Sequence, residues 1–283
     1  MQRQQLVQFL LGLAAAVSVA ATVLIFGFMV VLGLPLVSSG AFFNLFTSAW
    51  LPQQGLYGIA PMVAGTVAIA GLALLFSLPL SLGCAALIST LATGWLPSLL
   101  HRMVRFMTGI PTVVYGFAGI FLLVPLIRQL AGRGSGLCIL SAALLLAILI
   151  APTMILFFAD SFAAVPRSYL AAADACGATP VQKLIHVIIP CSWRGLTTGT
   201  ILALGRAVGD TLIALMIAGN ATAWPTTPID PARTLTAHIA LVVAADFDSL
   251  EFRTLFACGI LLYAFTTVTV IAARRLINGK QRR

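Results

Sequence analysis

The chain has 283 residues, of which 60% are hydrophobic and only 8% are charged, and its mean hydropathy is +1.07. Soluble domains carry about 25% charged residues. This composition therefore excludes an ordinary soluble enzyme and a disordered chain, and it predicts an all-α polytopic membrane protein surrounded by lipid. The net charge of +9 does not indicate a nucleic-acid partner, because the basic residues gather at predicted membrane edges.

Apolar stretches of about 20 residues, the length that spans a bilayer, recur along the chain. Six are predicted, at residues 9–34, 61–88, 106–127, 137–161, 196–219 and 254–273. The second and third are expected to break at Pro79 and Pro111. The first is longer than the apolar part of a signal peptide, so we expect it to remain as a span. We treat residues 1–283 as a single transmembrane domain.

The distribution of Lys and Arg predicts the orientation of these spans. With the termini inside, eleven basic residues fall on the inside and four on the outside, which places both termini in the cytoplasm. The longest outside segments are 35–60 and 220–253. Their Trp50 and Trp224 are either interfacial anchors or ordinary loop residues. A short helix is expected within 234–245.

Motifs for cofactors, metals and covalent catalysis are missing from the sequence. There is no G-x-x-x-x-G-K-[ST] phosphate loop, no HExxH and no GxSxG. The three histidines are far apart, and the five cysteines are scattered without CxxC spacing, so we expect the cysteines to be small packing residues. We therefore expect no cofactor, no metal and no catalytic residue in this chain.

The inside segment at 165–190 has the signals of two short helices. Ser168 is expected to cap the first helix, and Gly177 to end it in the left-handed conformation. Residues 179–182, Thr-Pro-Val-Gln, resemble a capping box with Pro at the first helical position. Pro190 is expected to stop the second helix. The product is either a docking surface for a partner or a folded connection between spans.

Arg206 and Asp210 lie in the middle of the fifth predicted span. A charge at mid-bilayer costs about 2.5–3.5 kcal/mol on insertion scales, so such residues usually face a water-filled path or a partner. The pair either lines a substrate path or locks two helices together. At a spacing of one turn both side chains are expected to face the same direction. Gly199, Gly205 and Gly209 would let a helix or a hydrated anion come close.

A resemblance to a known family starts in the inside segment. It is similar to the cytoplasmic EAA loop of ABC importer permeases, whose pattern is E-A-A-x3-G-x9-I-x-L-P. Ala172, Ala173, Gly177 and Pro190 match the pattern, and Ala171 stands where the pattern has Glu. In that family the loop is a coupling helix that seats in a groove of the ATPase subunit. The resemblance thus assigns ATPase coupling to Ala172, Ala173, Asp174, Cys176, Gly177, Ala178 and Thr179.

Other segments resemble the phosphate-specific, PstC-type permeases. They lie, in the family's order, at residues 50–61, 111–117, 203–211 and 234–237. The likeness covers most of the chain from residue 50 onward. At the positions of Arg206 and Asp210 this family has Arg and Glu.

The resemblance implies a type I ABC importer permease of the bacterial inner membrane, with core spans at about 61–273. It further implies a paralogous permease, two ATP-binding ATPase subunits and an extracytoplasmic phosphate-binding protein as partners. Phosphate would cross by alternating access, and only the ATPase subunits would hydrolyse ATP. One alternative is a permease for sulfate, molybdate or tungstate. Another is an ion-driven transporter or channel acting alone, which the scarcity of acids within the spans, Asp160 and Asp210, disfavours.

Overall fold

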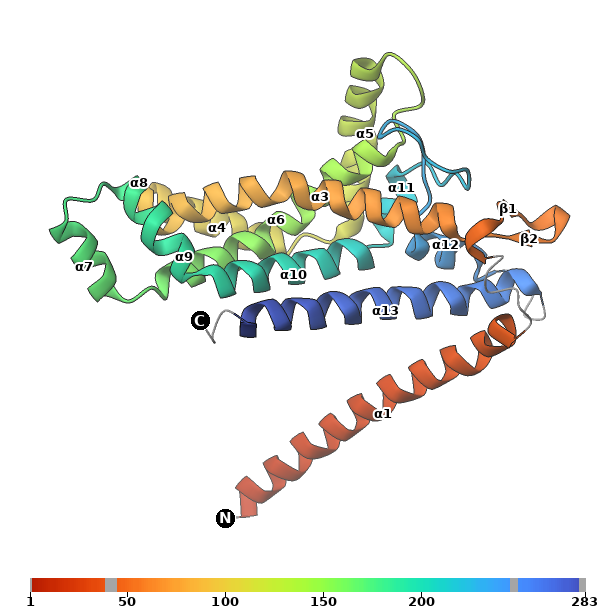
Figure 1. Ribbon diagram of the computed structural model, residues 1–283, viewed down its shortest axis with the longest axis horizontal. Helices are drawn as coiled ribbons and strands as arrows, with labels where there is room; N and C mark the ends of the chain where they lie inside the picture. The colour runs from red at the N-terminus through yellow and green to blue at the C-terminus, as the bar shows by residue number, and fades with distance from the viewer. Residues whose placement is uncertain (1, 39–44, 245–248, 280–283) are drawn as a thin grey trace.

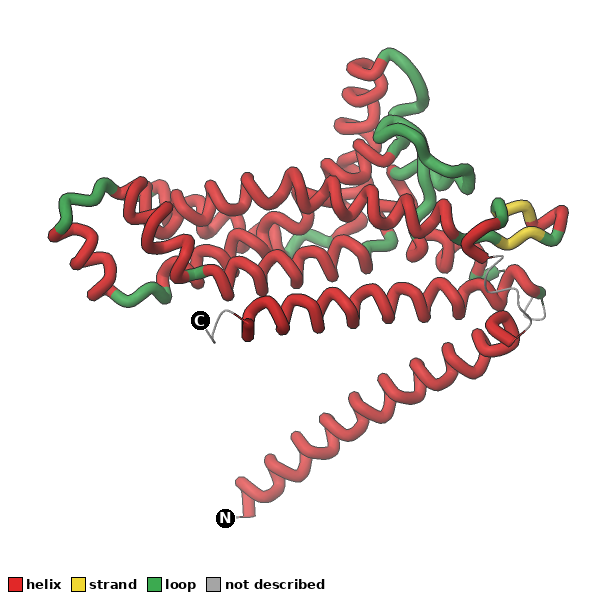
Figure 2. Tube along the Cα trace, viewed as in Figure 1, coloured by secondary structure: helices red, strands yellow, loops and turns green. Residues whose placement is uncertain are grey.

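The computed structural model describes residues 2–38, 45–244 and 249–279, and these are almost entirely helical (Figures 1 and 2). The long helices are α1 (Gln2–Ser38), α3 (Ala60–Ala86), α4 (Leu96–Thr108), α5 (Thr112–Ala131), α6 (Ile139–Ala163), α10 (Trp193–Gly209) and α13 (Leu250–Gly279). The short helices are α7 (Arg167–Ala175), α8 (Pro180–Lys183), α9 (Ile189–Cys191), α11 (Leu212–Ile217) and α12 (Leu235–Val242). Single π-helical turns lie at Leu87–Leu91 and Leu184–Ile188. Strands β1 (Trp50–Leu51) and β2 (Leu56–Tyr57) form a small antiparallel hairpin around a 3-10 turn at Pro52–Gln54.

The number of spans agrees with the sequence. Within the described residues, five helices are long and apolar enough to cross a membrane, namely α1, α3 with its π turn, α5, α6 and α13. A sixth span forms if Pro180–Cys191 and Trp193–Gly209, which meet at an angle of 73°, count as one bent span. The all-α polytopic fold with about six spans is thereby confirmed.

Helix α6 is the centre of the bundle, and α3 and α10 pack along it. The buried Ser81 hydroxyl of α3 lies 3.4 Å from the Ala151 carbonyl oxygen of α6. Pro79 lies inside α3, which continues through it as one helix, so the predicted break there is wrong. Neighbouring helices can support a proline in a membrane helix in this way.

Helix α1 leaves the bundle and contacts α13 near its own C-terminal end (Figure 1). The rings of Phe26 and Tyr263 lie 4.6 Å apart, and those of Phe28 and Phe256 lie 6.1 Å apart. The rest of this apolar helix is exposed along the described chain. An apolar surface of this size is stable only in lipid or against another membrane protein.

The third predicted span, at 106–127, is shifted in the structure. An amphipathic helix, α4, precedes it from Leu96 to Thr108, and the chain then breaks before α5 begins at Thr112. Pro111 has an extended conformation with ψ of 143°, and a proline disfavours helix at the residue before it. Arg102 and Arg105 therefore lie on a helix rather than in a loop between spans.

Trp50 is buried, which decides against the interfacial anchor that the sequence left as one of two alternatives. Only 7% of its surface is exposed, and its ring packs edge-on against His238 at 4.3 Å and against Tyr57 at 5.7 Å. Trp50 belongs to β1 of the small hairpin, and its ring reaches His238 of α12. Trp224, in contrast, is exposed.

Candidate functional site

Helices α7 and α8 form a hairpin at one end of the bundle, which we call the coupling hairpin, residues 167–183 (Figure 1). Gly177 has φ of +73°, which confirms the predicted left-handed end of the first helix. The predicted capping box is also present. The Gln182 amide donates to Thr179 Oγ1 at 3.3 Å, and the Thr179 amide donates to Gln182 Oε1 at 2.8 Å.

Two predicted helix ends are wrong by a few residues. Pro166, not Ser168, precedes the first residue of α7, and no side chain caps that end. Pro190 does not stop the second helix, because it sits in the first turn of α9, where a missing N–H is tolerated. The helical path continues to Cys191 and bends at Ser192, before α10 begins.

An ion pair that the sequence analysis missed joins the two arms of the coupling hairpin. Lys183 Nζ of α8 lies 2.6 Å from Asp174 Oδ1 of α7. The only signal in the sequence was one acid and one base on either side of a predicted turn. All residues predicted to couple lie in this hairpin, and none is buried: Ala172, Ala173, Asp174, Cys176, Gly177, Ala178 and Thr179.

The cysteines only partly follow the prediction of a packing role. Cys138 and Cys258 are buried, and Cys84 is half-buried. Cys176 in the coupling hairpin and Cys191 at its exit are exposed, so the prediction is wrong for these two.

Arg206 extends from α10 toward α6, where its Nη1 donates to Thr153 Oγ1 at 3.2 Å. The side chain is partly buried, and its charge also acts on Tyr115 of α5 and on Asp210. One guanidinium thus joins the two spans α10 and α6. A polar contact from Thr153 keeps its plane oriented and leaves most of its five N–H donors for other acceptors.

Asp210 does not lie on the same helix as Arg206, which corrects the prediction of one shared helical face. Helix α10 ends at Gly209, and Asp210 is extended with ψ of 123°. Its Oδ2 accepts a hydrogen bond from the Ile213 amide at 2.8 Å, so it caps the start of α11. In the part of the chain that the structure describes, no ion pair joins Asp210 to Arg206.

Helix α12 holds this break in place. Thr234 caps α12 by accepting a hydrogen bond from the Ala237 amide at 3.1 Å, which confirms the predicted short helix; residue 245 lies outside the described residues. Thr236 Oγ1 then donates to the Asp210 carbonyl oxygen at 2.9 Å. The Leu235 amide donates to Thr66 Oγ1 of α3 at 2.9 Å. Thr236 of α12 therefore holds the break in the fifth span, and Thr66 of α3 anchors α12.

The three glycines that were predicted to allow close approach differ from one another in what surrounds them. A Cβ at Gly199 would lie 2.9 Å from the Phe157 Cβ, so this glycine does let α10 approach α6. A Cβ at Gly205 or at Gly209 would meet nothing within 4 Å. These two positions face open space beside Arg206, not a packed helix of this chain.

The loop between α11 and α12 is held by polar contacts. Both threonines of the pair Thr226 and Thr227 donate backbone and side-chain hydrogen bonds to the Asp230 carboxylate, which hold the pKa of Asp230 below its usual range. Arg233 Nε donates to the Asn220 carbonyl oxygen at 3.0 Å. Burial lowers the pKa of Arg233, and nearby Glu251 opposes that shift.

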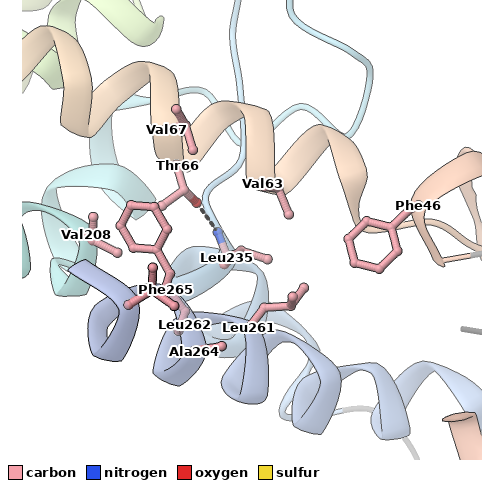
Figure 3. Close-up of a pocket in the computed structure, with 11 residues that line it drawn as sticks. Phe46, Val63, Thr66, Val67, Val208, Leu235, Leu261, Leu262, Ala264 and Phe265 are labelled. Carbon is pink, nitrogen blue, oxygen red and sulfur yellow. Dashed lines mark hydrogen bonds between the residues drawn. The ribbon is translucent and has the colours of Figure 1, made fainter. Parts of the chain in front are cut away.

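The apolar pocket of Figure 3 does not provide a site for a charged ligand. It has a volume of about 310 Å³ and lies between α3, α10, α12 and α13. Its lining is Phe46, Val63, Thr66, Val67, Val208, Leu235, Leu261, Leu262, Ala264, Phe265 and Val268. Thr66 Oγ1 is already occupied by the Leu235 amide. Arg206 is not among the residues that line this pocket.

Comparison with known proteins matches residues 77–283 to the family model described as "Binding-protein-dependent transport system inner membrane component". A similar protein is the probable ABC transporter permease protein YqgH of Bacillus subtilis, 32% identical over 94% of this chain and 88% of that protein. The phosphate transport system permease protein PstC of Haemophilus influenzae is 30% identical over 84% of this chain and 81% of that protein.

Solved structures share the fold at low sequence identity. A subunit of the inward-facing MetNI methionine ABC transporter matches with a TM-score of 0.64 and 18% identity, over 81% of this chain and 97% of that chain. A bacterial ABC transporter for the acidic polysaccharide alginate matches with a TM-score of 0.59 and 13% identity, over 77% of this chain and 78% of that chain.

Proposed function

The chain belongs to the binding-protein-dependent transport system inner membrane components, and from this membership we propose that it carries inorganic phosphate across the membrane. It is a permease subunit of an ABC importer with the type I permease fold. The similarity to PstC proteins over most of the chain supports phosphate as the substrate. The observation that carries the proposal is the partly buried Arg206 in a bent span, oriented by Thr153.

A guanidinium suits a phosphate that crosses a membrane. Its planar N–H donors can bind two oxygens of the anion at once, and its charge replaces part of the lost hydration. The Asp210 carboxylate is engaged by the Ile213 amide, so it does not neutralise Arg206 directly. It stays close enough to act on Arg206 electrostatically, and we expect this competition to promote release of the anion.

The coupling hairpin is the proposed contact with the ATPase. It lies at the end of the bundle opposite to β1, β2 and α12, and both α1 and α13 have their chain-terminal ends toward the hairpin side (Figure 1). This arrangement supports a cytoplasmic hairpin with both termini on the same side. An extracytoplasmic phosphate-binding protein would then dock at the opposite end.

The proposed complex has this chain, a paralogous permease, two ATPase subunits and the binding protein. ATP-driven closure of the ATPase subunits would move the hairpin, which the bend at Ser192 connects directly to α10 and thus to Arg206. The central path would face the two sides of the membrane in turn. This chain performs no covalent chemistry.

Uptake of radiolabelled phosphate by the assembled importer tests the proposal. We expect Arg206→Gln to stop uptake while the complex still assembles, and Arg206→Lys to be impaired because the planar fork is gone. The control Arg275→Gln removes one exposed positive charge from α13 and should transport normally. Normal uptake by Arg206→Gln would refute the substrate-path role. A structural role would instead show as lost assembly in Arg206→Gln.

Competition experiments separate the remaining alternatives. Excess sulfate, molybdate or tungstate should not reduce phosphate uptake by the wild type. Strong inhibition by one of them would make that oxyanion the substrate. Uptake that persists without the ATPase subunits would instead indicate an ion-driven transporter or channel.

A further inference from the structure

The hydroxyl group of Thr153 has a hydrogen-bond donor that the described residues do not use. Among these residues, its one hydrogen bond is the one that Thr153 Oγ1 accepts from Arg206 Nη1 at 3.2 Å. A hydroxyl group has one donor and two acceptor sites, so the Thr153 proton has no acceptor in this part of the chain. Polar groups inside proteins are nearly always paired, and the partly exposed Thr153 is therefore free to donate to a ligand.

Other threonines of the membrane helices use this donor within their own helix. The hydroxyl groups of Thr66, Thr200 and Thr269 each donate to the carbonyl oxygen four residues earlier, at 2.7–2.8 Å. This bond is a common way for a helical threonine to satisfy its hydroxyl group. Thr153 Oγ1 instead contacts Arg206 of α10. Its proton is thus available beside the guanidinium group.

Helix α10 leaves room beside the guanidinium group. Arg206 is partly exposed, and Gly205 and Gly209 are exposed. A Cβ at either glycine would meet nothing within 4 Å. At about 3.6 residues per turn, these three residues lie within about a third of the helix circumference. An anion can therefore approach Arg206 along the face that the two glycines keep open.

Thr153 lies near the middle of its membrane span. Helix α6 runs from Ile139 to Ala163, so Thr153 is two residues from the middle residue, Ala151. That is about 3 Å at a rise of about 1.5 Å per residue. A lipid headgroup lies about 15 Å from the middle of the hydrocarbon core and does not reach this depth. The remaining acceptors for the Thr153 proton are a transported anion or a polar group of another subunit.

The guanidinium group and the hydroxyl group can bind one oxygen atom of an anion together. Nη1 of Arg206 and Oγ1 of Thr153 are 3.2 Å apart. A single oxygen atom can therefore lie about 2.7–3.0 Å from both, the ordinary length of such hydrogen bonds. In the part of the chain that the structure describes, Arg206 donates to no other side chain, so its remaining N–H groups can bind a second oxygen atom.

We propose that Thr153 is a second substrate-binding residue, whose hydroxyl group donates a hydrogen bond to the transported phosphate while Arg206 binds the same anion. This inference rests on the proposed function, because it names a further contact at the same site. The anion then contacts α6 and α10 at once. A neutral donor stabilises the anion less than a second positive charge would, so it replaces lost hydration without trapping the anion in the path.

Uptake of labelled phosphate by the reconstituted importer, at saturating phosphate, gives the first test. Thr153→Val has nearly the same shape but no hydroxyl group, and we expect it to lower the rate about tenfold, as for one lost hydrogen bond to a charged group. Thr153→Ser keeps the hydroxyl group and should keep most of the rate. The matched control Thr200→Val removes a hydroxyl group that donates to the Leu196 carbonyl oxygen, and its rate should not change. Co-purification of the ATPase subunits checks that each variant assembles.

A double substitution separates contact with the anion from orientation of Arg206. Lysine has no planar group, so in Arg206→Lys an orienting role of Thr153 disappears. If Thr153 binds the anion, adding Thr153→Val to Arg206→Lys lowers the remaining uptake about tenfold again. If this addition changes nothing, Thr153 acts only through Arg206 and the proposal is wrong.

Thiol accessibility gives a test that does not depend on transport. Exposed Cys176 and Cys191 are first replaced by Ser, and the full complex in nanodiscs is treated with a small, negatively charged thiol reagent. Thr153→Cys should react, and inorganic phosphate should slow the reaction. The control Thr200→Cys, at a position that lines a largely apolar pocket, should show no effect of phosphate. If Thr153→Cys does not react, a group of another subunit occupies the position and the proposal is wrong; a reaction that phosphate does not slow would also overturn it.

The uptake measurements distinguish failure of this inference from failure of the proposed function. Normal uptake by Thr153→Val beside lost uptake by Arg206→Gln would overturn this inference alone. Normal uptake by Arg206→Gln would refute the proposed function itself.

Discussion

Substitution of Gly177 is expected to weaken coupling through backbone strain alone. Its φ of +73° lies in the left-handed region, and a Cβ there would meet nothing within 4 Å in this chain. An L-residue other than glycine pays about 1–2 kcal/mol for that conformation. For a β-branched residue, the strain energy lies toward the upper part of the range of about 1–3 kcal/mol.

Few other interactions hold the coupling hairpin. Helix α7 has no fully buried residue and only Leu170 packs against the main core, so its position depends largely on the capping box of Thr179 and Gln182 and on the ion pair of Asp174 and Lys183. These contribute about 1 kcal/mol and about 0.5 kcal/mol. A local stability of about 1.5 kcal/mol keeps about 90% of the hairpins in the conformation that docks. A strain of about 2 kcal/mol would lower the population of that conformation to about 30%. We therefore expect Gly177→Val to lower uptake about threefold.

Two measurements on the same membranes check this expectation: co-purification of the ATPase subunit and uptake of labelled phosphate. Gly177→Asn serves as the matched control, because Asn adopts the left-handed conformation readily and should behave like the wild type. If Gly177→Val bound the ATPase and transported normally, the shape of the hairpin would not matter for coupling. If Gly177→Asn failed as badly as Gly177→Val, bulk in the ATPase groove would be the cause, not backbone strain.

Three further changes have defined outcomes. Reversing the charge of Asp174 or of Lys183 alone should weaken ATPase co-purification, and reversing both charges should restore it. If neither single change has an effect, the 2.6 Å ion pair has no role in docking. Gly199→Ala should destabilise the purified protein by about 1–3 kcal/mol through overpacking, and thus lower its thermal midpoint, because the new Cβ would lie 2.9 Å from an α6 side chain. Gly205→Ala should leave the thermal midpoint unchanged, because its Cβ would meet nothing within 4 Å. Because the pKa of Asp230 is lowered from 3.8, its stabilisation of the loop between α11 and α12 is present above that pH and is lost as the pH falls below it. Corrected hydrogen exchange of the loop should therefore stay constant down to about pH 5 and rise in stronger acid, and Asp230→Asn should show the fast exchange at every pH.

Local patterns in the sequence were sufficient for the fold class and for the coupling hairpin. Apolar stretches nearly free of charge predicted about six spans, because the cost of burying charge in lipid acts on each stretch separately. Gly177 and the capping box at Thr179 were predicted correctly for a similar reason, since each depends on hydrogen bonds within one turn of the chain.

The geometry around the candidate anion site depended on tertiary contacts instead. A spacing of four residues predicted that Arg206 and Asp210 share a helical face, but Thr236 of α12 stabilises a break between them. Arg105 lies on a helix because α4 packs on α6 through Val104, although its charge favoured a loop position in the sequence. In each case a contact between residues far apart in the chain overrides a local preference, because burial satisfies backbone groups and hydrophobic side chains that no neighbour in sequence can reach.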